Sequence, residues 1–211
     1  MATPAAAGTI TQSDRASVVA ALGGGAVVED FSSDFHFPIS TGVLNAATDL
    51  VMANGAPITP GMILAGVTYS TPVGSGNFFN IDGLSSFYSG GFLDSLNANT
   101  VLTATFDAAQ TSFGFDTNKK MGGFFNITIN FANGTPYTAK VTVPNSNTLS
   151  GFGFTSSGAD IISATLTAAP GSGFALDSFT YGPGVPLPEP GSLALLAGFL
   201  GAGLLVRRKA G

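Results

Sequence analysis

The sequence predicts an all-β fold: an antiparallel β-sandwich of jelly-roll type with one short N-terminal helix, followed by a single C-terminal transmembrane helix. Two observations carry this prediction. The chain of 211 residues has 29 Gly but only 9% charged residues, too few to cover the surface of a helical bundle. Residues 125–131 and 137–143 alternate apolar and polar side chains on either side of Asn133-Gly134, which is typical of a hairpin with one buried face.

The composition also excludes several classes of function. The 12 acidic residues outnumber the 7 Lys and Arg, whereas a nucleic-acid-binding protein needs a basic surface. The absence of Cys excludes a disulfide scaffold, a thiol enzyme and a cysteine zinc site. A hydrophobic fraction of 45% excludes an intrinsically disordered chain.

A single helix is expected near the start of the chain. Residues Thr11–Asp14 resemble a capping box, residues 18–22 carry a short apolar stripe, and Gly23–Gly25 end the helix. Residues 1–8 are expected to be the remainder of a leader, because Ala5–Ala7 resembles the small-residue end of a signal peptide.

Short segments rich in β-branched and aromatic residues predict nine or ten strands in the body of the chain. The expected strands are 26–31, 67–70, 77–81, 101–106, 111–116, 125–131, 137–143, 151–155, 161–167 and 174–181. Residues 32–66 contain Gly and Pro with few strand signals, and long loops at one end of the sandwich are expected there. The β-sandwich domain therefore spans 9–181, and 182–187 form a Gly/Pro linker.

The C-terminal segment, residues 188–211, has three parts. The first is a rigid extended tripeptide, since each proline restricts its own backbone and that of the preceding residue. The second, 191–206, is uncharged and at about 1.5 Å per residue forms a helix of roughly 24 Å, close to the span of a thin membrane. The third is a basic cluster, which favours a cytoplasmic C-terminus. The tripeptide and the cluster consist of Pro188, Glu189, Pro190, Arg207, Arg208 and Lys209.

This order of Pro-Glu-Pro motif, short apolar helix and basic cluster resembles the PEP-CTERM sorting signal of Gram-negative bacteria. The resemblance implies that an exosortase, a membrane protease-transpeptidase, reads the tripeptide and cuts at or near it. It implies that the helix holds the chain transiently in the inner membrane and that the basic cluster stops transfer. It further implies export to the cell surface or the extracellular matrix, where such proteins are linked to exopolysaccharide and biofilm.

Three segments of the body resemble recurring strands of PEP-CTERM cargo domains, and the third also resembles the last strand of jelly-roll carbohydrate-binding modules. They are Phe113–Asp116, Gly151–Phe154 and Phe174–Gly182. In such modules an Asp at the position of Asp177 helps to bind a structural calcium, and an acidic residue on an early strand completes the site. Glu29 or Asp30 would fill that place, because calcium takes carboxylate and carbonyl oxygens. The alternative is that these acids are solvated or cap turns.

Other candidate chemistry is weaker. The aromatic pairs 78–79, 87–88 and 124–125 each place one ring on either face of a strand, so that outward rings would allow stacking on sugars, although the absence of Trp argues against this. The single His, His36, lies beside residues 33–34 in one polar stretch, which does not amount to a catalytic triad. Glycoside hydrolysis uses a pair of carboxylates, and the exported part contains one Glu.

The leading interpretation is therefore a non-enzymatic, exported β-sandwich that is processed by an exosortase. The alternative is a carbohydrate-binding module, and a third interpretation, an Asp-dependent hydrolase, would require three Asp converging in a deep cleft. No catalytic residue is expected, and structural calcium is the only cofactor considered. The expected partners are the exosortase, the inner membrane and polysaccharide, and not nucleic acid.

Overall fold

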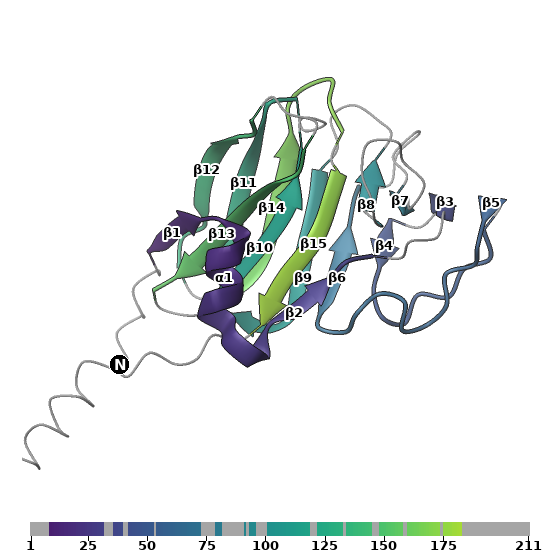
Figure 1. The fold of residues 1–211 in the computed structure, drawn as a ribbon, viewed down its shortest axis with the longest axis horizontal. Helices are drawn as coiled ribbons and strands as arrows, with labels where there is room; N and C mark the ends of the chain where they lie inside the picture. Colours follow the sequence, from purple (N-terminus) through teal and green to yellow (C-terminus); the bar gives the residue numbers. More distant parts are fainter. Residues whose placement is uncertain are drawn as a thin grey trace, which may run out of the picture.

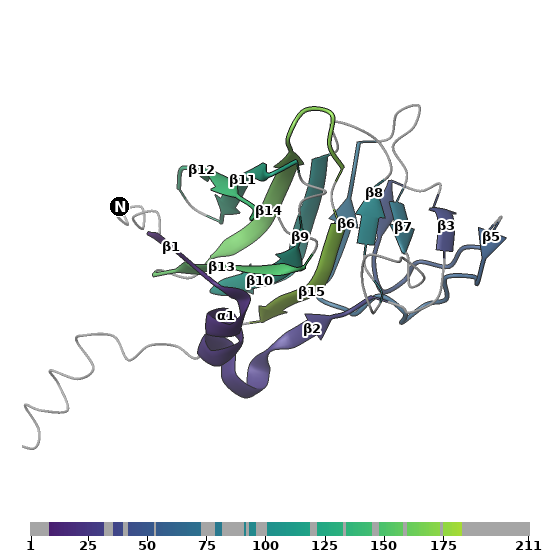
Figure 2. The ribbon, with the colours of Figure 1, turned by 45° about the horizontal axis from the view of Figure 1, so that its top comes forward.

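In the computed structural model of the chain, two antiparallel sheets pack face to face, and one short helix lies against the outer face of the larger sheet (Figures 1 and 2). The residues that the structure describes are 9–31, 36–39, 42–52, 54–72, 79–81, 91, 93–95, 101–118, 122–132, 134–144, 148–157, 160–173 and 175–182. Within these ranges the predicted all-β architecture of two antiparallel sheets with one short helix is confirmed.

The larger sheet has nine strands in the described residues, in the order β1-β13-β10-β15-β8-β7-β3-β5, with β2 also paired to β15. Its strands are β1 (Ile10–Ser13), β2 (Val27–Glu29), β3 (His36–Ile39), β5 (Asn54–Gly55), β7 (Phe79–Ile81), β8 (Leu93–Ser95), β10 (Ser112–Thr117), β13 (Ser150–Ser156) and β15 (Ala175–Gly182). The described residues of the three body segments singled out in the sequence lie on β10, β13 and β15, which are neighbours in this sheet; Phe174 lies outside the described residues.

The smaller sheet has six strands in the described residues, in the order β12-β11-β14-β9-β6-β4. They are β4 (Val43–Leu44), β6 (Val67–Ser70), β9 (Val101–Gln110), β11 (Phe124–Phe131), β12 (Tyr137–Thr142) and β14 (Ile161–Ala168). The predicted hairpin is confirmed, because β11 and β12 pair with Ile127 opposite Ala139. Alternate residues of β11 are buried, as the period-two pattern predicts.

The core between the sheets is rich in aromatic rings. Phe179 on β15 lies at its centre, with its ring centroid 5.4 Å from that of Tyr69 on β6 and 6.1 Å from that of Phe113 on β10. The rings of Phe106 and Phe115 lie at 6.2 Å and 6.4 Å from Phe179. Rings from both sheets therefore interlock around one buried side chain, and this packing joins the two layers.

The helix α1 (Arg15–Leu22) begins at Asp14, whose carboxylate accepts a hydrogen bond from the Ser17 amide at 2.7 Å. Hydrogen bonds from the side chain and the amide of Ser17 lower the pKa of Asp14. The helix ends at Gly23, which has a positive φ of 56°, as expected of a glycine that follows a helix. Val18 and Leu22 are the buried residues of the helix.

Three glycines, Gly114 on β10 and Gly151 and Gly153 on β13, allow α1 to approach the larger sheet. A Cβ atom on Gly153 would lie 2.6 Å from Val18 Cγ2 and would also collide with the Asp14 carbonyl oxygen. A Cβ atom on Gly114 would lie 2.8 Å from the carbonyl oxygen of Phe152. These positions therefore have no room for a side chain.

Replacing Gly153 with alanine is expected to lower the free energy of unfolding by about 1–3 kcal/mol, because the added methyl group overpacks the contact between α1 and β13. Denaturation in urea measures the effect. Gly24→Ala is the matched control, since a Cβ atom at Gly24 meets nothing within 4 Å. Equal stability of the two variants would contradict the close packing of α1.

Two expectations about local structure are wrong. Residues 11–13 do not open the helix but belong to β1, which pairs with β13, and Asp14 caps the helix instead. The stretch 32–66 is not only loop, because its described residues include β3, β4 and β5. These strands have two to four residues each, and strands this short show no readable periodicity.

Three of the predicted segments lie outside the described residues: the leader 1–8, residues 183–187 of the linker, and the sorting segment 188–211. The predictions made for them stay predictions. Within the described part of the chain, no helix has both the length and the apolar character that a membrane span requires.

Candidate functional site

The structure places Glu29, the first predicted calcium ligand, inside the protein. It lies on β2 opposite Phe179 of β15, and its side chain is buried. One carboxylate oxygen accepts a hydrogen bond from the Phe31 amide at 2.9 Å, and the other accepts one from the Leu64 amide at 2.6 Å. Burial raises the pKa of Glu29, and these two hydrogen bonds oppose the shift. The carboxylate therefore ties β2 to the segment that leads into β6.

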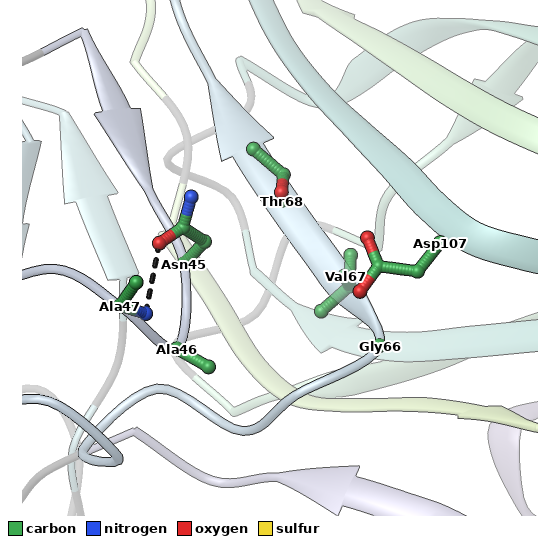
Figure 3. A pocket seen from close by; sticks show the side chains of 7 residues that line it. All are labelled: Asn45, Ala46, Ala47, Gly66, Val67, Thr68 and Asp107. Atoms are coloured by element: carbon green, nitrogen blue, oxygen red, sulfur yellow. Dashed lines mark hydrogen bonds between the residues drawn. The ribbon is translucent and has the colours of Figure 1, made fainter.

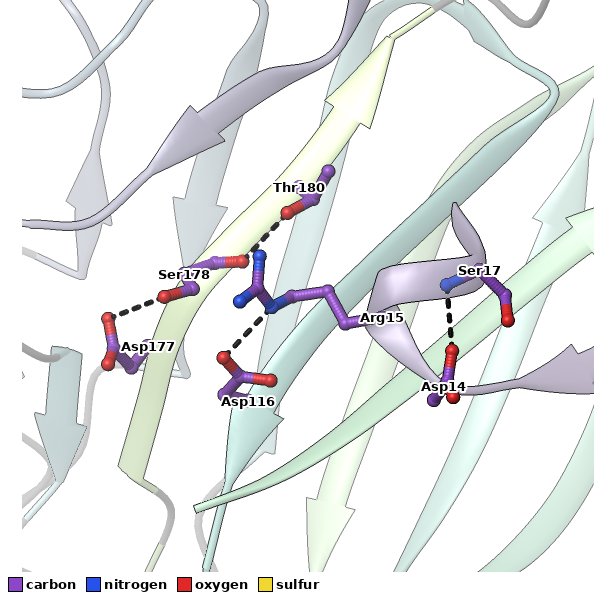
Figure 4. A network of polar contacts seen from close by, with 7 residues as sticks. All are labelled: Asp14, Arg15, Ser17, Asp116, Asp177, Ser178 and Thr180. Atoms are coloured by element: carbon purple, nitrogen blue, oxygen red, sulfur yellow. Dashed lines mark hydrogen bonds and ion pairs between the residues drawn. The ribbon is translucent and has the colours of Figure 1, made fainter. Parts of the chain in front are cut away.

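Asp177 lies elsewhere, on the outer face of the larger sheet beside the helix (Figure 4). It pairs in register with Asp116, whose carboxylate forms a salt bridge of 2.8 Å with Arg15 Nε. The Ser178 hydroxyl donates to Asp177 at 3.2 Å. Burial raises the pKa of Asp177, the charge of Asp116 adds to this rise, and the charge of Arg15 opposes it. The salt bridge between Arg15 and Asp116 therefore joins α1 to β10.

The predicted calcium ligands do not converge. Glu29 faces the core with Phe179, Asp177 lies beside Asp116 on the outer face of the sheet, and Asp30 is exposed. Among the described residues, no three His, Asp or Glu side chains are grouped as a metal site requires. Calcium binding therefore stays a prediction from resemblance, without a ligand set in this part of the chain.

The candidate aromatic pairs are only partly described. Phe125 is buried in the core, whereas its neighbour Phe124 lies on the outer face of the smaller sheet, with Lys140 Nζ 3.8 Å from its ring centroid. Phe79 lies on β7. Residues 78, 87 and 88, and also 33 and 34 beside His36, lie outside the described residues.

A pocket of about 210 Å³ opens at the β4/β6 side of the smaller sheet. Figure 3 shows the residues that line it: Asn45, Ala46, Ala47, Gly66, Val67, Thr68 and Asp107. Asn45 follows β4, Thr68 lies on β6, and Asp107 lies on β9. The side-chain Nδ2 of Asn45, the Thr68 hydroxyl and the Asp107 carboxylate have no hydrogen-bond partner among the described residues. The pocket thus offers one donor, one hydroxyl and one charged acceptor.

An irregularity in β9 places Asp107 at this pocket. Thr105 pairs with Ser163 and Gln110 pairs with Ile161 of β14, so β9 carries more residues between these pairs than β14 does. The Gln110 Nε2 donates to the Ala108 carbonyl at 2.6 Å within this bulge. The Asp107 amide donates to the Gly66 carbonyl at 3.0 Å. Bulges often re-aim side chains beside functional sites.

The turn after β4 fixes Asn45. The side-chain Oδ1 of Asn45 accepts a hydrogen bond from the Ala47 amide at 2.9 Å. The backbone amide of Asn45 donates to the Thr48 hydroxyl at 2.9 Å. Such local bonds are typical of an Asx turn. Because Oδ1 is held by the turn, Nδ2 is the group that remains for a ligand.

Gly66 lines the pocket, and a larger residue does not fit at this position. Its φ is +107°, and a Cβ atom would lie 2.9 Å from the ring of Tyr181. The Tyr181 hydroxyl donates to the Ala65 carbonyl at 2.6 Å. With the Glu29–Leu64 hydrogen bond, this contact anchors the wall of the pocket to the larger sheet. Glu29 thus holds the segment that leads into the pocket at Gly66, without lining the pocket itself.

Asn45, Thr68 and Asp107 are not among the site residues predicted from the sequence. One available signal was the loss of alternation on β9, where the exposed run from Asp107 to Ala109 follows a regular pattern up to Phe106. This run lies near the turn at Asn45 because β6 pairs with both β4 and β9. Pairing between distant segments cannot be read from the spacing of apolar residues along the chain.

Comparisons with known proteins give only a partial likeness. No protein family and no curated protein matches the chain. Among solved structures, TmCBM61 in complex with β-1,4-galactotriose is similar over 54% of this chain and 88% of its own, with 11% identity and a TM-score of 0.37. The family 11 carbohydrate-binding module from Clostridium thermocellum, in complex with a β-1,3-1,4-mixed-linked tetrasaccharide, is similar over 57% and 85%, with 14% identity and a TM-score of 0.26. These structural neighbours are carbohydrate-binding modules, but TM-scores of this size assign the chain to no family.

Proposed function

We propose that this chain is a non-catalytic β-sandwich that binds polysaccharide, with one sugar unit held in the pocket of Asn45, Thr68 and Asp107. The observation that carries the proposal is a set of three polar groups that line the pocket and have no hydrogen-bond partner in the described part of the chain. A carboxylate accepts hydrogen bonds from two hydroxyl groups, an amide NH₂ donates, and a threonine hydroxyl does either. Sugar hydroxyl groups match all three.

The size of the pocket favours one sugar unit. Its volume of about 210 Å³ is below the range of about 300–1,000 Å³ for sites that enclose a drug-sized ligand. An open pocket of this size suits a unit whose neighbours continue along the protein surface.

The non-catalytic role rests on the number of carboxylates. Hydrolysis of a glycosidic bond uses two, whereas Asp107 is the one carboxylate among the described residues that line the pocket. We therefore place Asp107 in binding and assign it no chemical step.

Replacing Asp107 with alanine is expected to weaken polysaccharide binding at least tenfold, because a hydrogen bond to a charged group contributes about 1.5–3 kcal/mol. Gel electrophoresis in the presence of a panel of neutral polysaccharides, and then titration calorimetry with the retarding polymer, measures this. The exposed Asp49 lies in the same loop as Asn45 but does not line the pocket, so Asp49→Ala is the charge-matched control. If the two variants bind alike, the pocket is not the site.

We propose in addition that the C-terminal segment exports the domain to the place where it meets its ligand. The support is the order of the Pro188-Glu189-Pro190 motif, the apolar run 191–206 and the basic cluster 207–209. The exosortase would be the partner in processing, and the cell surface or matrix would be the destination.

Changing Glu189 to alanine is expected to leave the chain unprocessed in a host that has an exosortase, because the motif would no longer be read. Intact mass of the mature protein reports the cleavage directly. Glu29→Ala is unsuitable as a control because Glu29 is buried, whereas exposed Asp30→Ala keeps the same change in charge. Normal processing of the Glu189 variant would refute the sorting proposal.

A further inference from the structure

Most of the outer face of the six-stranded sheet is an array of small polar side chains, which we call the hydroxyl face; the same side also carries the exposed Val43 and the Phe124–Lys140 pair. The small polar residues alternate along each strand with the core residues beneath. They are Thr68 and Ser70 on β6, Thr103 and Thr105 on β9, Ser163, Thr165 and Thr167 on β14, Asn126, Thr128 and Asn130 on β11, and Thr138 and Thr142 on β12.

One row of the hydroxyl face begins in the pocket. Thr68 lies opposite Thr105, Thr105 opposite Ser163, and Ser163 opposite Asn130, and directly opposed residues point to the same side of a sheet. With strands about 4.8 Å apart, the row extends roughly 14 Å from the pocket across four strands. A single sugar unit in the pocket would leave most of this row uncovered.

The row combines free groups with held ones. The hydroxyl groups of Thr68 and Thr105 have no partner among the described residues, whereas Asn130 Nδ2 donates to the Ser163 hydroxyl at 2.9 Å. In the next row, the hydroxyl groups of Thr103 and Thr165 lie 3.0 Å apart and share a hydrogen bond. The free groups are available to a ligand, and the held ones are fixed in orientation by their neighbours.

The charge of this surface selects the class of ligand. In the six strands of this sheet, the charged residues are Asp107, at the pocket, and Lys140, whose ammonium lies over the Phe124 ring. The chain as a whole carries a formal charge of -5. The two charges of this sheet cancel, so the face has no excess of cations to attract a polyanionic glycan, and the negative chain as a whole would repel one. An uncharged glycan would meet no such repulsion.

We infer that the hydroxyl face binds a linear, uncharged polysaccharide that lies across the strands, from the pocket over β9 and β14 toward β11. This inference rests on the proposed function and names its ligand class. The polymer, and not an isolated sugar, is the ligand because the pocket and the row form one continuous polar surface.

Titration calorimetry with a ladder of one to six sugar units, prepared from the polysaccharide that retards the protein in gels, tests this inference. We expect the affinity to rise at least tenfold between one unit and four. We expect Thr105→Val, which removes a hydroxyl group and keeps the branched shape, to weaken binding of the longer oligomers at least threefold and to leave the single sugar unchanged. Ser163→Ala is a second variant of the same row, and exposed Thr11→Val on β1 of the other sheet is the matched control.

The outcomes separate the two proposals. If affinity does not depend on length and the Thr105 and Ser163 variants bind like the Thr11 variant, while Asp107→Ala still loses binding, the inference is wrong and the pocket proposal stands. If an acidic polysaccharide binds as tightly as the neutral one, the ligand class is wrong. If no glycan binds the full chain, both proposals fail.

Discussion

Replacing Phe179 with alanine is expected to lower the free energy of unfolding by about 3–5 kcal/mol, the usual cost of removing a buried aromatic side chain. The Phe179 ring is fully buried and contacts rings from both sheets. A typical domain has only about 5–15 kcal/mol of stability in total. The variant is therefore expected to be close to unfolding at physiological temperature, as guanidinium denaturation would show.

The same change at Phe124 is the control for this experiment. Phe124 lies on the outer face of the smaller sheet, partly exposed, with Lys140 over its ring. Removing it forfeits a cation–π contact of about 0.5–1 kcal/mol at an exposed site and little else. Similar losses in Phe124→Ala and Phe179→Ala would mean that the aromatic cluster does not join the two sheets.

The second large effect is expected at Glu29. Alanine in its place leaves the buried amide of Phe31 and the partly buried amide of Leu64 without their acceptor. A buried unsatisfied group costs about 1–3 kcal/mol, and the partly buried amide adds less. The loss should be seen in the free energy of unfolding, and also in weaker polysaccharide binding, since the Leu64 hydrogen bond anchors the wall of the pocket. Asp30→Ala, next in sequence but exposed, should change neither.

The pH dependence of stability gives a separate test of Glu29. Burial raises its pKa in the folded chain above the ordinary value of 4.5, so the folded state holds this proton at a pH where the unfolded state has released it. The part of the stability that depends on this proton is therefore complete below about pH 4.5 and is lost as the pH rises through the folded-state pKa. The Glu29→Gln variant should lack this decline. If the wild type and the variant show parallel pH profiles, Glu29 does not carry the raised pKa.

Much of the fold was predictable from the sequence because its longer strands have strong periodicity. The hairpin of β11 and β12 is an example. One of its faces packs on the core and the other is solvated, so apolar and polar residues alternate along both strands. The short strands β3, β4 and β5 were missed because their existence depends on partners distant in sequence. The same holds for β1, whose sequence resembles the start of a helix but which pairs with β13 in the structure.

The candidate site was less predictable than the fold. Glu29 and Asp177 were singled out for their residue type, but burial and strand pairing gave them separate structural roles on opposite faces of one sheet. The pocket residues Asn45 and Asp107 are common types in unremarkable stretches of sequence. Only the pairing of β6 with both β4 and β9 brings them together.

The most direct test of polysaccharide binding is a ¹⁵N-labelled NMR titration of the full chain with the neutral oligosaccharide that binds in calorimetry. We expect the amide signals of Asn45, Thr68 and Asp107 to shift first, followed by that of Thr105 with longer oligomers. Signals of Arg15 and Asp116, on the outer face of the opposite sheet, should stay in place. Shifts confined to Arg15, Asp116 and their neighbours would contradict the account, because they would place the binding surface on the wrong sheet.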